Sequence, residues 1–147
     1  CFLFLGEGEE EERLKSMVAE AGLEQHFTFA GYRENVGEIL TVIDILLHPA
    51  TMEGFANVAM QALAAAKPVV SSAVGGMPEI VLDGETGILV PPQNPAAIVD
   101  ALDKLLSDSS LRDKLGRKGQ QRVKEKFSVE NMVANTLAVY EKILAEN

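Results

Sequence analysis

Five short, unbroken apolar runs, separated by helical patterns, constrain the fold of this chain more than any other feature of its sequence. An unbroken run is typical of a strand buried on both faces, because a half-exposed strand alternates apolar and polar residues. Helices between such strands predict an α/β fold, a Rossmann-like parallel sheet with helices on both faces. The 147 residues have the length of a single domain. The expected strands are residues 2–5, 27–30, 45–47, 68–71 and 88–90.

The helical patterns carry start and stop residues at their ends. Gly22 follows the first pattern as a C-terminal stop, and Asn94-Pro95 provides an N-cap followed by proline at the first helical position. Ser128 is placed to cap the last helix. The expected helices are residues 9–21, 36–43, 56–66, 78–82, 95–106, 111–127 and 129–145.

Composition and charge argue against several classes of function. A net charge of −9 argues against a nucleic-acid partner. No apolar run approaches the roughly 20 residues that a membrane-spanning helix needs, and one cysteine and two histidines are too few for most metal sites. Residues 111–126 hold seven basic residues against two acidic ones. We interpret them as solvated helix surface, with contact to an anionic lipid or a phosphate-bearing acceptor as the alternative.

The loop after strand 45–47 is the best candidate for a ligand site, because parallel sheets bind ligands at the carboxyl ends of their strands. Gly54 lets a ligand approach the backbone, and the free N–H groups at the start of the next helix can hold a diphosphate. Glu53 can accept hydrogen bonds from sugar hydroxyls. Gln61 lies about 12 Å further along that helix. A sugar, a diphosphate and a ribose would span this distance.

Several motifs, in order and at characteristic spacing, resemble the C-terminal, donor-binding domain of retaining GT-B glycosyltransferases, and among them the GT4 group. Each motif is weak alone, but together they cover essentially the whole chain. The resemblance implies a GT-B half that lacks its first strand and helix. The motifs are Phe4-Leu5-Gly6-Glu7-Gly8, Phe29-Ala30-Gly31-Tyr32-Arg33, Glu53-Gly54-Phe55, Lys67-Pro68-Val69-Val70, Gly75-Gly76-Met77-Pro78-Glu79 and residues 83–92.

The resemblance also implies roles for individual residues. Glu53 would be the catalytic contact, touching donor sugar hydroxyls near the reacting carbon. Gln61 stands where the family usually has a second glutamate that binds the ribose, so this chain departs from the family pattern. A carboxamide offers a weaker acceptor than a carboxylate. The implied donor-binding residues are Gly6, Tyr32, Arg33, Gly54, Phe55, Ala56, Asn57 and Gln61.

For the whole protein the resemblance implies sugar transfer, with retention, from a nucleoside diphosphate sugar to an acceptor hydroxyl, without a metal or cofactor. The family's N-terminal acceptor domain and its diphosphate-binding arginine and lysine would precede Cys1. We therefore expect this fragment alone to be inactive. The expected location is cytoplasmic, with peripheral contact at the inner face of the membrane as an alternative.

Other interpretations stay open. Gln61 favours a catalytically inactive nucleotide-sugar-binding module. A dehydrogenase half is a further alternative, although Gly6-Glu7-Gly8 lacks the third glycine of a dinucleotide fingerprint and precedes an acidic run. For three other positions we expect structural roles: His48 at a strand end, Gly75-Gly76 as turn residues, and Glu79 as a partner of a helix N-terminus.

Overall fold

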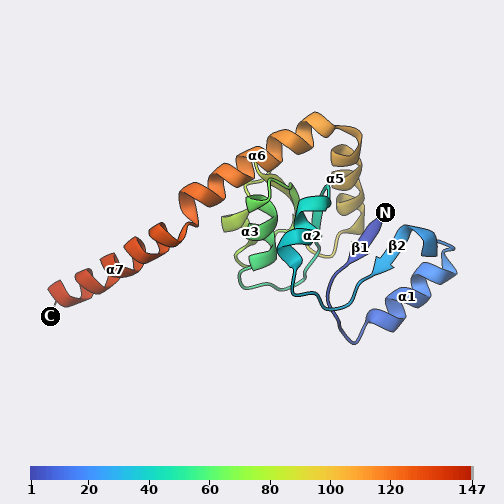
Figure 1. The fold of residues 1–147 in the computed structure, drawn as a ribbon, viewed down its shortest axis with the longest axis horizontal. Helices are drawn as coiled ribbons and strands as arrows, with labels where there is room; N and C mark the ends of the chain where they lie inside the picture. Colours follow the sequence, from blue (N-terminus) through green and yellow to red (C-terminus); the bar gives the residue numbers. More distant parts are fainter. Residues whose placement is uncertain (147) are drawn as a thin grey trace. The chain divides into compact units, whose positions relative to one another are not determined.

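The computed structural model describes residues 1–146, which divide into two compact units, residues 1–36 and residues 37 onward. All five expected strands form, and every pairing between them is parallel. In Figure 1 the first unit is drawn in blue and the last helix in red. The strands make two sheets, one of two strands and one of three, where the sequence predicted a single sheet. The α/β class, with parallel strands flanked by helices, is confirmed.

The first unit is held together by stacked phenylalanine rings. Strands β1 (Phe2–Phe4) and β2 (Phe27–Phe29) pair in register, and the rings of Phe4 and Phe29 stack with centroids 4.8 Å apart. The expected burial on both faces is wrong for β1, where Phe2 stays 42% exposed. The physical reason is that α1 (Glu11–Glu20) buries no residue and the 3-10 helix η1 (Glu24–His26) buries none either.

The second unit contains the sheet that carries the candidate loop. Its strands are β3 (Leu46–His48), β4 (Val69–Ser72) and β5 (Gly87–Val90), in that order, so β4 is central. All four residues of β4 are buried. Because neighbouring residues of a strand point to opposite faces, both faces of the sheet are covered there, as the sequence predicted.

The helices of the second unit begin close to the expected residues. The predicted caps are confirmed: the side chain of Asn94 accepts from the Ala97 N–H at 3.1 Å, and that of Ser128 accepts from the Asn131 N–H at 3.2 Å. The last helix buries none of its residues. The helices are α2 (Val36–Val42), α3 (Asn57–Ala64), α4 (Met77–Ile80), α5 (Pro95–Ser107), α6 (Ser109–Lys126) and α7 (Val129–Ala145).

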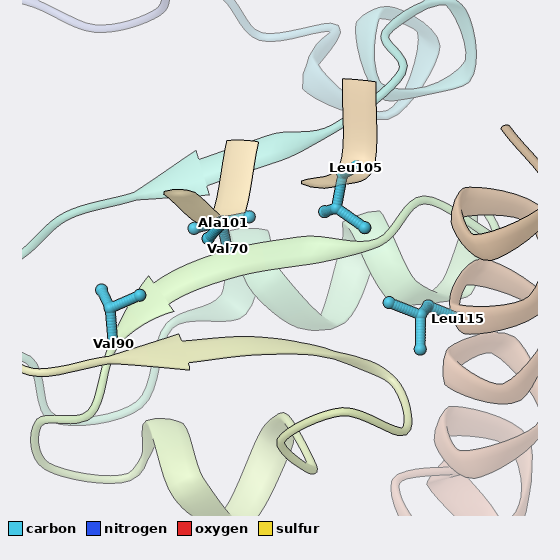
Figure 2. Close-up of a cluster of buried hydrophobic side chains, with 5 residues drawn as sticks. All are labelled: Val70, Val90, Ala101, Leu105 and Leu115. Atoms are coloured by element: carbon cyan, nitrogen blue, oxygen red, sulfur yellow. The ribbon is translucent and has the colours of Figure 1, made fainter. Parts of the chain in front are cut away.

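One cluster of buried side chains fixes α5 and α6 against the sheet. Figure 2 shows Val70 of β4 and Val90 of β5 beside Ala101 and Leu105 of α5, with Leu115 supplied by α6. All five are at most 5% exposed. This core anchors the central strand β4, whose carboxyl end leads into the glycine loop that supports the candidate site.

Two glycines of α6 let it approach α3 closely. A Cβ on Gly116 would lie 2.0 Å from the carbonyl oxygen of Ala66, and one on Gly119 would lie 2.5 Å from a methyl group of Leu63. Ala66 itself follows α3 in the left-handed region, with φ of 57°, and so presents its carbonyl to α6. This contact was not expected from the sequence, because both glycines lie inside a helical pattern.

We expect Gly116→Ala to lower the free energy of unfolding by about 1–3 kcal/mol, although alanine favours the helix, because backbone atoms cannot yield to the new methyl group. Gly37→Ala in α2, with no atom within 4 Å of the added Cβ, is the matched control. That control should be neutral or stabilising. Urea unfolding of both variants measures the difference. An equal response from the two would show that the α3–α6 contact adapts freely.

Candidate functional site

The loop between β3 and α3 carries Glu53 and places its carboxylate beside a histidine. Nε2 of His48, the last residue of β3, lies 3.1 Å from Oε2 of Glu53, and the two side chains are 21% and 26% exposed. An ionised carboxylate can only accept, so the imidazole is the donor. In the described part of the chain, no lysine or arginine forms an ion pair with Glu53. The carboxylate is therefore held by a hydrogen bond while it stays accessible.

A second loop, after β4, supports the backbone of this first loop. The Gly76 N–H donates to the Gly54 carbonyl at 2.9 Å. Gly75 has φ of 50°, and a Cβ on it would lie only 1.6 Å from the Glu53 carbonyl oxygen. Gly75 and Gly76 were expected to be turn residues. The structure adds that only glycine lets the two loops pack this closely.

Phe55 adds an aromatic contact to the loop. Its ring meets that of Phe127 edge-on at 6.0 Å, just past the end of α6. Arg122 lies over the Phe127 ring and donates to the carbonyls of Glu79 and Ile80 at the end of α4. The predicted donor-binding residue Phe55 thus has a packing partner, although it remains 43% exposed.

Helix α3 begins directly after this loop and presents an open N-terminus. Ala56 is the N-cap residue, and no side chain caps the helix. Asn57 and Gln61 are both exposed and lie one turn apart on the same face, whereas Leu63 is fully buried. The carboxylate of Glu53 and the first N–H groups of α3 therefore occur within one loop, a hydrogen-bond acceptor next to an anion-binding helix end.

The remaining predicted residues belong to the first unit, where two loops join at the carboxyl ends of β1 and β2. The Gly6 N–H donates to the Gly31 carbonyl at 2.9 Å, and the Glu7 carboxylate accepts from the Tyr32 N–H at 3.3 Å. Tyr32 and Arg33 are exposed beyond this junction. Gly6, Tyr32 and Arg33 are thus neighbours within the first unit, with Glu7 as a linking residue that was not expected from the sequence.

The charged stretch of α6 is only partly free surface. Arg112 donates to the carbonyls of Leu105 and Leu106 at the end of α5. Arg122 donates to the Glu79 carbonyl in α4, and Nζ of Lys118 lies 3.7 Å from Oε2 of Glu85. The interpretation as solvated surface is therefore wrong for Arg112 and Arg122, which are only partly exposed. Their charges neutralise helix carboxyl ends, where cations are favoured.

The described residues offer neither a metal centre nor a membrane-spanning helix. Among residues 1–146, no group of three or more His, Cys, Asp or Glu side chains is arranged to hold a metal ion. None of the helices in the same range combines the length and apolar character that crossing a bilayer requires.

Comparison with known proteins identifies the family. The family model described as "Glycosyl transferases group 1" matches residues 2–122. This chain belongs to the glycosyl transferases group 1 family. The match contains the β3–α3 loop and the glycine loop that supports it, so the geometry described above is that of a group 1 domain.

Relatives and solved structures agree with this assignment. The group 1 domain is 29% identical to N-acetyl-alpha-D-glucosaminyl L-malate synthase of Bacillus anthracis, over 99% of this chain and 38% of the relative. It superposes on sucrose-phosphate synthase of Thermosynechococcus elongatus with a TM-score of 0.87 and 30% identity, over 99% of this chain and 39% of that one. It superposes on Anabaena HepE in complex with UDP-glucose with a TM-score of 0.84 and 25% identity, over 93% of this chain and 40% of HepE. The group 1 domain thus spans about two fifths of the length of these proteins.

Proposed function

We propose that this group 1 domain is the donor-binding half of a retaining glycosyltransferase, which moves a sugar from a nucleoside diphosphate sugar to an acceptor hydroxyl. The observation that carries the proposal is the accessible Glu53 carboxylate in the loop that leads directly into the uncapped N-terminus of α3. A carboxylate binds sugar hydroxyls, and a helix N-terminus binds phosphate. The UDP-glucose complex of HepE, a structural neighbour, supports a donor of this kind.

In this proposal each part of the donor is contacted by different residues of the loop and of α3. Glu53 accepts from sugar hydroxyls near the reacting carbon, while the backbone N–H groups of Gly54, Phe55 and Ala56 face the sugar or the adjoining phosphate. Asn57 and Gln61, on the exposed face of α3, continue toward the ribose. For Gly6, Tyr32 and Arg33 of the first unit, donor binding stays a prediction.

The proposal includes a second domain. The chain spans about two fifths of the first relatives' length, so an N-terminal domain that binds the acceptor accounts for much of the difference. That domain and the linking segments would supply cations for the diphosphate. The departing diphosphate develops charge as the sugar leaves, and hydrogen-bond donors aimed at it lower the barrier. The domain alone should therefore bind donor without transferring sugar.

The location of the whole protein is part of the proposal, as a cytoplasmic enzyme, with peripheral contact at the inner face of the membrane as the alternative. Since Arg112, Arg122 and Lys118 are engaged within the fold, the exposed cations left on α6 are Lys114, Arg117, Lys124 and Lys126. Binding to anionic vesicles that salt abolishes would support this contact. No binding at low salt would remove it.

A catalytically inactive donor-binding module is the second candidate, and Gln61 is the observation that favours it. Its carboxamide lies on the exposed face of α3. A carboxylate at this position would form stronger hydrogen bonds with the two hydroxyls of a ribose than a carboxamide does. Both candidates bind a nucleoside diphosphate sugar. Sugar transfer by the full-length protein separates them.

Calorimetry of the full-length protein with UDP, ADP and GDP tests the proposed binding and names the base. We expect Gln61→Glu to tighten binding of the preferred nucleotide by about 1 kcal/mol, because the new carboxylate makes charge-assisted hydrogen bonds. Gln121→Glu on α6, also exposed, is the charge-matched control and should leave affinity unchanged. Unchanged affinity in Gln61→Glu would remove Gln61 from the ribose site. No affinity of the wild-type protein for any of the three would contradict the proposed function.

A further inference from the structure

His48 was expected to be a structural residue at a strand end, yet the structure connects it to the carboxylate of the candidate site. Its Nε2 lies 3.1 Å from Oε2 of Glu53. No hydrogen bond to Oε1 of Glu53 occurs within residues 1–146. One carboxylate oxygen is thus bound by the protein, and the other is left for a ligand.

The backbone of His48 is held in place by the neighbouring strand β4. Its carbonyl accepts from the Ser71 hydroxyl at 2.9 Å, and Ser71 is fully buried on the central strand β4. His48 and Ser71 are also register partners in the sheet. The imidazole therefore projects from a part of the backbone held by both a ladder and a buried side chain.

Glu53, unlike His48, lies outside any helix or strand. Glu53 lies in a loop, and its side chain has three rotatable bonds whose freedom must be lost before it can orient a substrate. The glycine loop packs against its carbonyl, but in the described chain only His48 hydrogen-bonds the carboxylate. Both the neutral Nε2–H tautomer and the imidazolium can donate this bond.

We propose that His48 is a positioning residue, whose Nε2–H holds Oε2 of Glu53 so that Oε1 faces the donor sugar. This inference rests on the proposed function, since it assigns the orientation of the carboxylate that contacts the sugar. Orientation of this kind acts on the chemical step more than on overall donor affinity, because small displacements of a reacting group cost more rate than binding.

Two substitutions at His48 separate the hydrogen bond from the bulk of the ring. His48→Leu removes the donor, whereas His48→Gln keeps an N–H donor the same number of bonds from the backbone. In the full-length protein we expect His48→Leu to lower kcat about tenfold or more with donor KM within about threefold, and His48→Gln to recover most of kcat. The exposed His26, substituted by leucine, is the matched control and should behave as wild type.

A double-mutant cycle tests whether His48 acts through Glu53. If it does, His48→Leu has no further effect on kcat in a Glu53→Ala background. Full additivity of the two effects would overturn the proposal. So would wild-type kcat in His48→Leu, or equal losses in His48→Leu and His48→Gln when both melt like wild type.

A spectroscopic readout does not depend on the reaction. The chain has two histidines, so His26→Gln leaves His48 as the only source of imidazole signals from this chain in nitrogen–proton spectra. We expect an observable Nε2–H proton that disappears on Glu53→Ala, as the bond to the carboxylate is lost. A signal that Glu53→Ala leaves unchanged would overturn the pairing. If the wild-type protein transfers no sugar, the proposed function fails, and this comparison still decides on the pair.

Discussion

Gly75→Ala should lower the free energy of unfolding by about 2–5 kcal/mol and remove most sugar transfer by the full-length protein. Two costs combine at this position. Alanine is disfavoured at φ of 50°, and its Cβ would lie 1.6 Å from the Glu53 carbonyl oxygen. The backbone of Glu53 would have to move, and displacing a contacting group by about 1 Å can cost on the order of 100-fold in rate.

Gly84→Ala is the matched control for this prediction. Gly84 has φ of 70°, but no atom lies within 4 Å of its added Cβ, so the substitution isolates the backbone cost. We expect a loss of about 1–2 kcal/mol and unchanged activity. Urea unfolding and steady-state kinetics of the two variants make the comparison. Equal losses of stability with activity retained in both would show that the glycine loop does not fix Glu53.

Glu53→Gln should reduce kcat of the full-length protein about 10- to 100-fold and leave donor KM within a few-fold. The carboxamide keeps an oxygen acceptor but loses the charge, and charged hydrogen bonds are worth about 1–2 kcal/mol more than neutral ones. The difference should appear mainly in the transition state, where charge develops on the sugar beside this side chain.

The control for Glu53→Gln is Glu79→Gln in α4. Glu79 is an exposed acid in the segment that follows β4 of the same sheet, and it has no assigned contact with the donor. Its substitution should leave both kinetic constants unchanged. A large rise in KM at constant kcat for Glu53→Gln would instead show that Glu53 binds ground state and transition state equally.

Features with local causes were predictable from the sequence. The caps at Asn94 and Ser128 depend on residues three positions away, and the structure confirms both. The strands and most helix bounds follow from local apolar patterns in the same way. The pairing of strands into two sheets was not predictable, because it depends on neighbours that periodicity does not specify.

The candidate site shows the same division. The loop with Glu53 was found from its motif, but the support from Gly75 and Gly76 and the hydrogen bond from His48 were not foreseen, because each depends on how separate segments approach in space. The order of the strands provides a signal that applies to other sequences. Residues that follow adjacent parallel strands meet at one edge of the sheet, so a glycine pair after β4 lies beside the loop after β3.

The bracing of Phe55 by Phe127 also bears on the order in which this unit is completed during synthesis. Strand β3 and its loop leave the ribosome well before the end of α6. Yet Phe55 of this loop contacts Phe127, which follows α6, and Arg122 of α6 donates to the backbone of α4. Contacts between distant parts of a chain form only after loop closure has been overcome. A nascent chain that has reached only β5 therefore holds the Glu53 loop by its glycine partners and by the His48 hydrogen bond, and the loop gains its aromatic contact once Phe127 has emerged.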